Sequence, residues 1–267
     1  VGTVTPKQQL GNPKPRIFRL EGDKALINRL GFNNHGSETV SKRISNNFPN
    51  GFLGINIGPN KETKNKEEDY LICISKLAKY AGYITINISS PNTERLRDFH
   101  DQKEMKKLLS GIDKITKENN IDCPLTIKIS PDINDNEIGT IVKLISEHNI
   151  QGIIISNTTD SNRDNLSDTK KHEIGGLSGQ PLKDISTHLI KKFYKETKGK
   201  IKIIGVGGVD SGESAYEKIT AGADAVQLYT GMVYKGPGIV KEIKKDLISI
   251  LKKENLKNIS QAVGINA

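Results

Sequence analysis

Hydrophobic and polar residues alternate along the chain in two patterns, short β-branched runs and longer amphipathic stretches. The short runs predict six β-strands, at 52–57, 83–88, 125–129, 151–156, 201–205 and 224–228. Apolar positions at helical spacing predict α-helices at 65–80, 102–118, 135–148, 184–197, 212–221 and 237–253, with Asp135 and Ser211 as N-caps. Strands that alternate with helices in this way are typical of a parallel sheet, either closed or open.

Three successive strands carry a polar residue near their C-terminal end. Asn56, Asn87 and Lys128 each lie on the strand face opposite to the neighbouring isoleucines. A parallel strand that helices cover on both faces would be apolar throughout, so these strands are predicted to have one face free of helices. A closed barrel has such a face, and its ligands bind at the C-terminal ends of the strands. Any one of these residues could be a core polar group whose hydrogen bonds are made within the protein. That alternative explains all three together poorly.

The first residues, Val1-Gly2-Thr3-Val4-Thr5, are typical of the end of a buried strand that runs into a turn at Pro6. A barrel needs eight strands. The six predicted strands and this tail therefore indicate a (βα)8 TIM barrel, whose first strand and most of its second are missing from the chain. No low-complexity linker divides residues 1–267, which we expect to form one partial catalytic domain starting at the end of the second barrel strand.

Glycine-rich loops follow the later strands. Gly205-Val206-Gly207-Gly208 closes one predicted strand and Tyr229-Thr230-Gly231 closes the next, just before a short helical turn. In barrels the last two such loops commonly bind a phosphate through backbone N–H groups, which a Cβ would obstruct. A tight turn explains one such loop, but two at the final strands favour a phosphate site. The spacing is not the G-x-G-x-x-G of dinucleotide-binding domains.

Lys128 and Ser90 are the candidates for chemistry. A lysine at the end of a barrel strand can stabilise negative charge on a reduced flavin, or it can form a Schiff base as in barrel aldolases; the residues alone leave both open. Ser90 lies in Ser89-Ser90-Pro91-Asn92, which by itself predicts a turn without chemistry. A serine is a poor base, so proton removal would require a closed site and an acidified C–H bond.

Four asparagines surround Ser90 in the predicted barrel mouth. They are Asn28, Asn87, Asn92 and Asn157. Side-chain amides both donate and accept hydrogen bonds, so this set suits a small, planar ligand that is itself rich in amides.

The composition narrows the classes of partner. The net charge is +9, but the basic residues are mostly lysines scattered over helix-like stretches, and only 5% of residues are aromatic, so we expect a solvated basic surface and no nucleic-acid partner. An anionic substrate or lipid surface is the alternative. Cys73 and Cys123 are predicted to be buried thiols in a reducing compartment. No apolar run approaches the length of a membrane span.

Taken in order, these segments resemble the class 2, quinone-dependent dihydroorotate dehydrogenases from Val1 to about Gly264. The matching motifs are Gly2-Thr3-Val4-Thr5-Pro6, Asn28-Arg29-Leu30-Gly31-Phe32-Asn33-Asn34, Gly54-Ile55-Asn56-Ile57-Gly58, Asn87 to Thr93, Lys128-Ile129-Ser130-Pro131-Asp132, Ser156-Asn157-Thr158-Thr159 and the glycine loops at 175–179, 205–208 and 229–231. No single motif is specific, whereas the ordered series is.

The resemblance implies oxidation of (S)-dihydroorotate to orotate in pyrimidine biosynthesis, with a non-covalent FMN and no metal. Ser90 is then the base that takes the C5 proton while a hydride leaves C6 for the flavin, and Lys128 is a flavin contact. The implied substrate-binding residues are Asn28, Arg29, Leu30, Gly31, Phe32, Asn87, Asn92, Asn157 and Thr158. The implied flavin-binding residues are Thr3, Asn56, Asn87, Lys128, Ser156, Gly179, Gly208, Tyr229 and Thr230, with Gly208, Tyr229 and Thr230 near the phosphate.

The resemblance also implies a monomer that passes electrons to a membrane quinone. It implies peripheral association with the cytoplasmic face of a bacterial inner membrane, or with the mitochondrial inner membrane in a eukaryote. The family's N-terminal membrane-associating helices, first strand, flavin-contacting glycine-rich segment and substrate-binding lysine have no counterpart here. Glu94-Arg95 replaces the usual Pro-Gly in the loop expected to close over the substrate, which affects closure and not the identity of the base. Ser156 and Thr230 replace the more usual Thr and Ser, and each keeps a hydroxyl.

Class 1 enzymes use a cysteine as base, and neither cysteine of this chain lies in such a loop. Two other hypotheses remain. One is a related FMN barrel such as a dihydropyrimidine dehydrogenase domain, although the cysteine clusters of iron–sulfur partners are absent from the sequence. The other is a barrel that binds a phosphorylated ligand without redox chemistry, such as an aldolase-like or regulatory protein.

Overall fold

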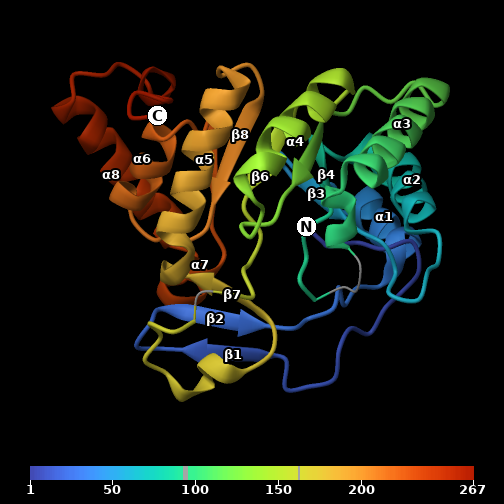
Figure 1. Ribbon diagram of the computed structural model, residues 1–267, viewed down its shortest axis with the longest axis horizontal. Helices are drawn as coiled ribbons and strands as arrows, with labels where there is room; N and C mark the ends of the chain where they lie inside the picture. The colour runs from blue at the N-terminus through green and yellow to red at the C-terminus, as the bar shows by residue number, and fades with distance from the viewer. Residues whose placement is uncertain (93–95, 162) are drawn as a thin grey trace. The chain divides into compact units, whose positions relative to one another are not determined.

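The computed structural model describes residues 1–92, 96–161 and 163–267 (Figure 1). The chain divides into two compact units. Unit 1 comprises Val1–Arg16, Arg29–Lys128 and Lys143–Gln151, and unit 2 comprises Ile17–Asn28, Ile129–Val142 and Gly152–Ala267. Glu94 and Arg95, whose presence is predicted to affect loop closure, lie outside the described residues.

Unit 1 is built on three parallel strands, β3 (Gly54–Ile57), β4 (Tyr83–Asn87) and β5 (Leu125–Lys128). Val4 adds a parallel bridge beside Ile57, so the predicted strand tail at the start of the chain is confirmed. The isoleucines of these strands are fully buried, as alternation in a half-covered strand requires. The helices of the unit are α1 (Gly36–Asn46), α2 (Lys66–Leu77), α3 (Gln102–Glu118) and the 3₁₀ turns η1 (Ala78–Tyr80) and η2 (Arg97–His100).

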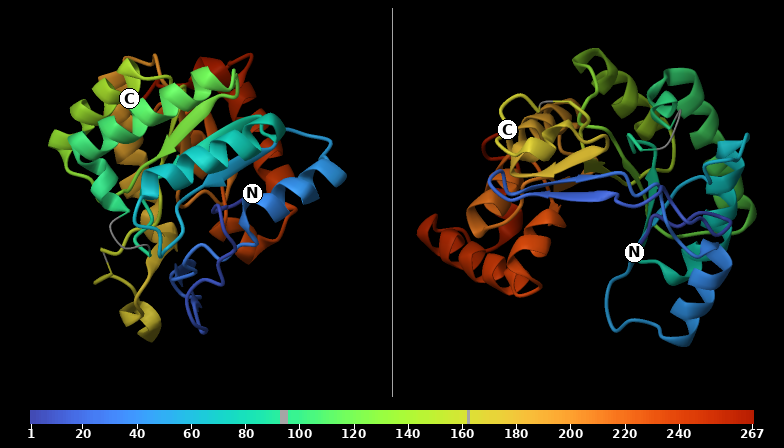
Figure 2. Two further views of the ribbon diagram at one scale, coloured as in Figure 1. Left: turned by 90° about the vertical axis from the view of Figure 1, so that its right-hand side faces the viewer. Right: turned by 90° about the horizontal axis from the view of Figure 1, so that it is seen from below.

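Unit 2 contains three further parallel strands, β6 (Gly152–Ile155), β8 (Lys202–Val206) and β9 (Ala225–Gln227). A separate antiparallel sheet is formed by β1 (Ile17–Leu20), β2 (Ala25–Asn28) and β7 (Gly176–Gly179), and Figures 1 and 2 show its three strands side by side. Leu20, Ala25, Ile27, Leu166 and Leu177 form its buried core.

The helices of unit 2 are α5 (Lys183–Thr197), α6 (Gly212–Thr220), α7 (Thr230–Lys235) and α8 (Ile239–Lys253), with the 3₁₀ turns η3 (Thr169–His172), η4 (Gln180–Leu182) and η5 (Ile259–Ala262). The division between the units falls inside α4 (Asp135–Glu147). No helix in the described ranges combines the length and hydropathy that crossing a lipid bilayer requires.

All six predicted strands and all six predicted helices are present, with ends that differ by a few residues at most. Ser211 is an N-cap as predicted: its side chain accepts a hydrogen bond from Ser214 N in a capping box. The prediction for Asp135 was wrong by one position, because α4 begins at that residue. Cys73 is buried, but Cys123 is only half-buried, so the prediction of two buried thiols was wrong for Cys123.

Candidate active site

The register of the strands in unit 1 aligns the three predicted polar residues. Asn87 and Lys128 are direct neighbours across β4 and β5, while Asn56 lies beside Thr85, two residues before Asn87. Residues two apart in a strand share a face, so Asn56, Asn87 and Lys128 lie on one face of the three strands. Thr85 and Thr126 bond to each other lower on the same face, with hydroxyl oxygens 3.0 Å apart. The predicted polar face is thereby confirmed for these strands.

A hydrogen-bonded network joins three of the residues predicted to contact a flavin. The Thr3 hydroxyl donates to Asn56 Oδ1 at 2.8 Å and accepts from Asn87 Nδ2 at 3.3 Å. Gly58 allows the approach of this network to Phe32, because a Cβ at Gly58 would lie 2.8 Å from Thr3 Cγ2 and 3.0 Å from Phe32 Cε2. The structure therefore brings together Thr3, Asn56, Asn87 and Phe32, which are far apart in the sequence.

Helix α2 supports Asn87 from behind. The Tyr70 hydroxyl, fully buried, donates to the Asn87 backbone oxygen at 2.6 Å. Burial raises the pKa of Tyr70, so the hydroxyl keeps its proton and stays a donor. The side chain of Asn87 accepts from Ser89 N at 3.4 Å and Ser89 Oγ at 3.3 Å, which directs the chain into the Ser90 loop.

Ser90 is buried, with 6% of its surface exposed. Its Oγ accepts a hydrogen bond from the Asn92 backbone N–H at 3.2 Å. This is the local turn that Ser-Pro-Asn favours, and Asn92 itself is half-buried. The N–H occupies one lone pair of Oγ, which orients the other lone pair and the hydroxyl proton.

Lys128 is half-buried, and burial lowers its pKa from 10.5 to about 8. A lysine with this pKa is still mostly charged at pH 7 and loses its proton as the pH rises past about 8, unless an anionic group stabilises the ammonium. Its place on the polar face fits both the flavin role and the Schiff-base role that the sequence left open.

The predicted substrate residues from Arg29 to Phe32 form a bend tied to the preceding loop of unit 1. Asn12 binds the backbone oxygens of Arg29 and Leu30, and Gln9 Nε2 donates to the Gly31 oxygen at 2.9 Å. Gly31 and Phe32 both have positive φ, 69° and 53°. The bend places the Phe32 ring against Gly58. It does so through a positive φ, a backbone conformation that residues other than glycine rarely adopt.

Unit 2 carries the remaining amides and hydroxyls. Asn28 ends β2 and donates from Nδ2 to Gly176 O at 3.5 Å. Ser156 is buried after β6, and Asn157 Oδ1 accepts from Thr158 N at 2.8 Å. Asp132 Oδ1 accepts from the hydroxyls of Thr159 and Ser161, which holds the loop after Thr158.

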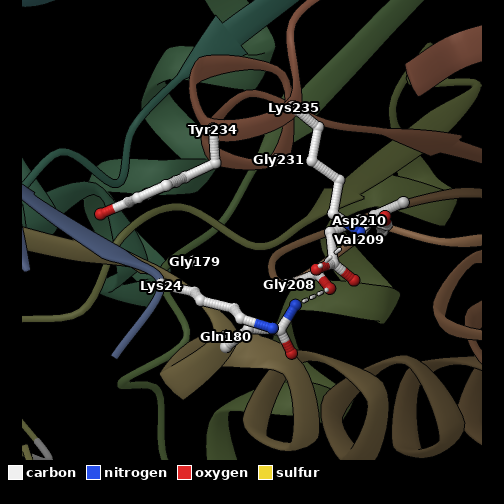
Figure 3. A pocket seen from close by; sticks show the side chains of 9 residues that line it. All are labelled: Lys24, Gly179, Gln180, Gly208, Val209, Asp210, Gly231, Tyr234 and Lys235. Carbon is white, nitrogen blue, oxygen red and sulfur yellow. Dashed lines mark hydrogen bonds and ion pairs between the residues drawn. The ribbon is translucent and has the colours of Figure 1, made fainter. Parts of the chain in front are cut away.

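A cavity of about 230 Å³ lies within unit 2, where β7, β8 and α7 meet (Figure 3). Three glycines line it, and at each of them a Cβ would meet neighbouring protein atoms. A Cβ at Gly179 would collide with the Lys24 carbonyl oxygen, and one at Gly208 with Lys183. A Cβ at Gly231 would lie 2.6 Å from the Val209 oxygen. Gly179 and Gly208 also have positive φ, 100° and 72°.

Glycine backbone, Lys24 and Gln180 border the cavity, and the Asp210 carboxylate is paired with Lys235, so the lining can take an anionic group such as a phosphate. Of the predicted phosphate residues, Gly208 lines the cavity. Thr230 lies beside it, with its hydroxyl 2.9 Å from that of Ser178, while Tyr229 is 66% exposed. Sequence reasoning missed five further residues that line the cavity and carry polar side chains: Lys24, Gln180, Asp210, Tyr234 and Lys235. Four of them follow a glycine loop closely in the sequence, which was the only signal that could have found them. Lys24 lies far from these loops in the sequence and lacks that signal.

The same fold occurs in solved structures of known enzymes. This chain superposes on the crystal structure of DHODH from Eimeria tenella in complex with ferulenol with a TM-score of 0.95, at 37% identity, over 100% of this chain and 78% of the other. The ligand-free form from the same organism gives a TM-score of 0.95 at 38% identity. The predicted fold class is confirmed: the chain has the α/β architecture of a TIM-barrel-like enzyme.

The model of the dihydroorotate dehydrogenase family matches residues 1–251. The chain is 46% identical over 253 residues to dihydroorotate dehydrogenase (quinone) of Idiomarina loihiensis, covering 92% of this chain and 75% of that protein. It is 43% identical over 263 residues to the protein of the same name from Bartonella tribocorum, covering 97% and 73%. This chain belongs to the dihydroorotate dehydrogenase family, whose members are flavoenzymes. The predicted resemblance to the quinone-dependent branch is thereby confirmed.

Proposed function

We propose that this chain oxidises (S)-dihydroorotate to orotate in pyrimidine biosynthesis, with FMN as cofactor and a membrane quinone as electron acceptor. The observation that carries the proposal is the hydrogen-bonded network of Thr3, Asn56 and Asn87, with Asn87 leading through Ser89 into the buried Ser90, in a chain of the dihydroorotate dehydrogenase family. Bound FMN would supply the hydride-acceptor and electron-transfer chemistry that this oxidation requires.

Ser90 removes the C5 proton. Ser90 is buried, and the Asn92 N–H occupies one lone pair of its Oγ, which leaves another lone pair to accept the C5 proton while the hydroxyl's own proton passes to solvent at the small exposed edge of the residue. The amides of Asn28, Asn87, Asn92 and Asn157 match the amide-rich pyrimidine ring, and Arg29, Leu30, Gly31, Phe32 and Thr158 complete the proposed substrate contacts.

Lys128 stabilises negative charge that develops on the flavin. Burial lowers its pKa to about 8, so an electron-rich ring beside it would raise that pKa and hold the ammonium charged. The Schiff-base alternative is not favoured, because the relatives are oxidoreductases by name. Thr3, Asn56, Asn87 and Ser156 complete the ring contacts. Gly179, Gly208, Tyr229 and Thr230 bind toward the phosphate end.

The proposed location at a membrane follows from the quinone acceptor. We place the enzyme as a monomer, peripheral on the cytoplasmic face of a bacterial inner membrane or on the mitochondrial inner membrane of a eukaryote. Residues 1–267 act as a catalytic domain in this proposal.

The function is tested with the yellow holoenzyme under anaerobic conditions. Dihydroorotate should bleach the flavin absorbance, and a soluble quinone analogue should restore it. Dihydrouracil, which lacks the carboxylate, should not bleach the flavin. Bleaching by dihydrouracil alone would instead support a dihydropyrimidine dehydrogenase activity, and a colourless protein would support a barrel without redox chemistry.

A further inference from the structure

We propose that Lys24 determines cofactor specificity in the unit 2 cavity, where its ammonium binds the phosphate and selects FMN over unphosphorylated riboflavin. The inference rests on the proposed function, since it requires a phosphorylated flavin in this cavity. Neither the family motifs nor the glycine loops include Lys24.

Lys24 is held at the rim of the cavity by its backbone. It lies in the turn between β1 and β2, where its N–H donates to Glu21 O at 3.1 Å and its carbonyl accepts from Gln180 N at 3.3 Å. The Gln180 side chain in turn donates to Gly208 O at 3.0 Å. Figure 3 shows the Lys24 side chain extending into the cavity toward Gln180 and Gly208.

Among the described charged residues that line the cavity, the ammonium of Lys24 is not compensated by a carboxylate of the lining. Lys235 Nζ lies 3.4 Å from Asp210 Oδ2 and donates to the Asp210 backbone oxygen at 2.7 Å, so this lysine and this carboxylate compensate each other. Burial raises the pKa of Tyr234, whose neutral hydroxyl donates to Ala25 O at 2.9 Å. Among the described residues that line the cavity, Lys24 therefore supplies the net positive charge. A phosphate dianion complements a site of this kind, and a neutral ribityl hydroxyl does not.

The backbone of Lys24 supports a role for its side chain. Its φ is 46°, in the left-handed region that glycine or asparagine adopts more readily than lysine. A lysine in this conformation carries backbone strain that glycine would avoid. The Lys24 side chain is exposed at the rim of the cavity, so its ammonium is accessible to a phosphate that enters there.

The test is a binding titration of apoprotein, prepared from the holoenzyme by removing its flavin. Wild type, Lys24→Met, Lys24→Gly and Lys24→Arg are each titrated with FMN and with riboflavin, followed by flavin fluorescence at low and high salt. Lys24→Gly keeps the fold intact, because glycine suits the positive φ. Lys241→Met is the matched control, since it removes an exposed lysine of α8 that does not line the cavity.

Lys24→Met and Lys24→Gly should weaken FMN binding by about tenfold or more, while riboflavin affinity stays within about twofold of wild type. Lys24→Arg should retain most of the FMN affinity, and the control should match wild type. The salt dependence of FMN affinity should also decrease in Lys24→Met and Lys24→Gly.

Two results would overturn the inference: unchanged FMN affinity in Lys24→Met and Lys24→Gly, or an equal loss of FMN and riboflavin. If wild type prefers FMN and the variants keep that preference, the inference fails and the proposed FMN cofactor stands. If wild type itself binds FMN no more tightly than riboflavin, the phosphate site of the proposed function fails as well.

Discussion

The polar face of unit 1 and the cavity of unit 2 are built from different parts of the polypeptide. On the polar face, side chains carry the recognition: the Thr3 hydroxyl joins two asparagine amides, and the buried Ser90 follows one of these asparagines by three residues. In the cavity, three glycines remove side chains so that the backbone forms the wall. The first arrangement can distinguish the chemistry of a substrate, whereas the second can hold any ligand of suitable charge and size. Variants of the two regions should therefore fail in different ways.

The largest effect is expected at the base. Ser90→Ala removes the group that takes the C5 proton, so flavin reduction at neutral pH should slow by about three orders of magnitude while FMN stays bound. Stopped-flow measurement of the bleaching of FMN-loaded protein by dihydroorotate checks this. Ser89→Ala is the matched control, because it changes the adjacent buried serine, and it should stay within about tenfold of wild type. Reduction of Ser90→Ala at the wild-type rate would remove Ser90 as the base.

In the cavity, Gly179→Ala should weaken FMN binding by about two orders of magnitude. The added Cβ collides with the Lys24 carbonyl, and the φ of 100° is unfavourable for alanine. The flavin content of purified protein measures the loss. Gly238→Ala is the control, since a Cβ added there would meet no atom within 4 Å and its φ is −60°. Full flavin content in Gly179→Ala would show that this backbone contact is unimportant.

A buried lysine behind the cavity loop gives a pH-dependent prediction. Lys218 Nζ donates to Ser186 Oγ at 2.6 Å, and Ser186 Oγ donates to Gly207 O at 3.3 Å. Burial lowers the pKa of Lys218 to about 8, with Glu217 and Asp184 opposing that shift and Lys183 adding to it. Because this pKa is lowered on folding from 10.5, the buried ammonium destabilises the fold below pH 8, and the cost disappears as pH rises toward 10.5.

The free energy of unfolding of wild type relative to Lys218→Met should therefore rise by about 2 kcal/mol between pH 7 and pH 10. Denaturant unfolding of both apoproteins at each pH measures it, and the difference cancels the titration of groups that the two proteins share. A difference that falls with pH, or stays flat, would contradict the lowered pKa.

The smallest effect is expected behind the polar face. Tyr70→Phe removes the donor to the Asn87 backbone oxygen and leaves that buried carbonyl without this partner, at a cost of about 1–2 kcal/mol. We expect flavin reduction to slow by about tenfold and the melting temperature to fall by several degrees. Tyr80→Phe, in the nearby turn η1, should change neither. A Tyr70→Phe enzyme that is less stable but reduces its flavin at the wild-type rate would limit Tyr70 to a structural role.

The two regions also differ in how far the sequence predicts them. Alternation within β3, β4 and β5 placed Asn56, Asn87 and Lys128 on one face, because period two is a local property of each strand. The antiparallel sheet was missed, since its four-residue strands are too short for a clear pattern and β7 follows β2 by about 150 residues. Helix α1 was missed because Val40 and Ile44 are the only large apolar residues in it, which is too few for a clear helical pattern.

Lys24 shows the limit most clearly. Its side chain reaches the cavity only because β2 pairs with β7, which brings the turn before β2 beside Gly179 and Gln180. No sequence pattern near Lys24 indicates the pairing of β2 with β7, so a prediction from local sequence could not have assigned Lys24 to the cavity. The asparagines and Ser90 were predictable because ordered motifs carry them, whereas the Thr3–Asn56–Asn87 hydrogen bonds required the structure.

The central claim is that substrate chemistry and cofactor retention can be separated by variants of the two regions. The most direct test is an FMN titration of apo Ser90→Ala and apo Gly179→Ala beside wild type. Ser90→Ala should bind FMN with the wild-type Kd, and Gly179→Ala should need about a hundredfold more FMN for half-saturation. Equal loss of FMN affinity in both variants, or a loss confined to Ser90→Ala, would contradict the claim.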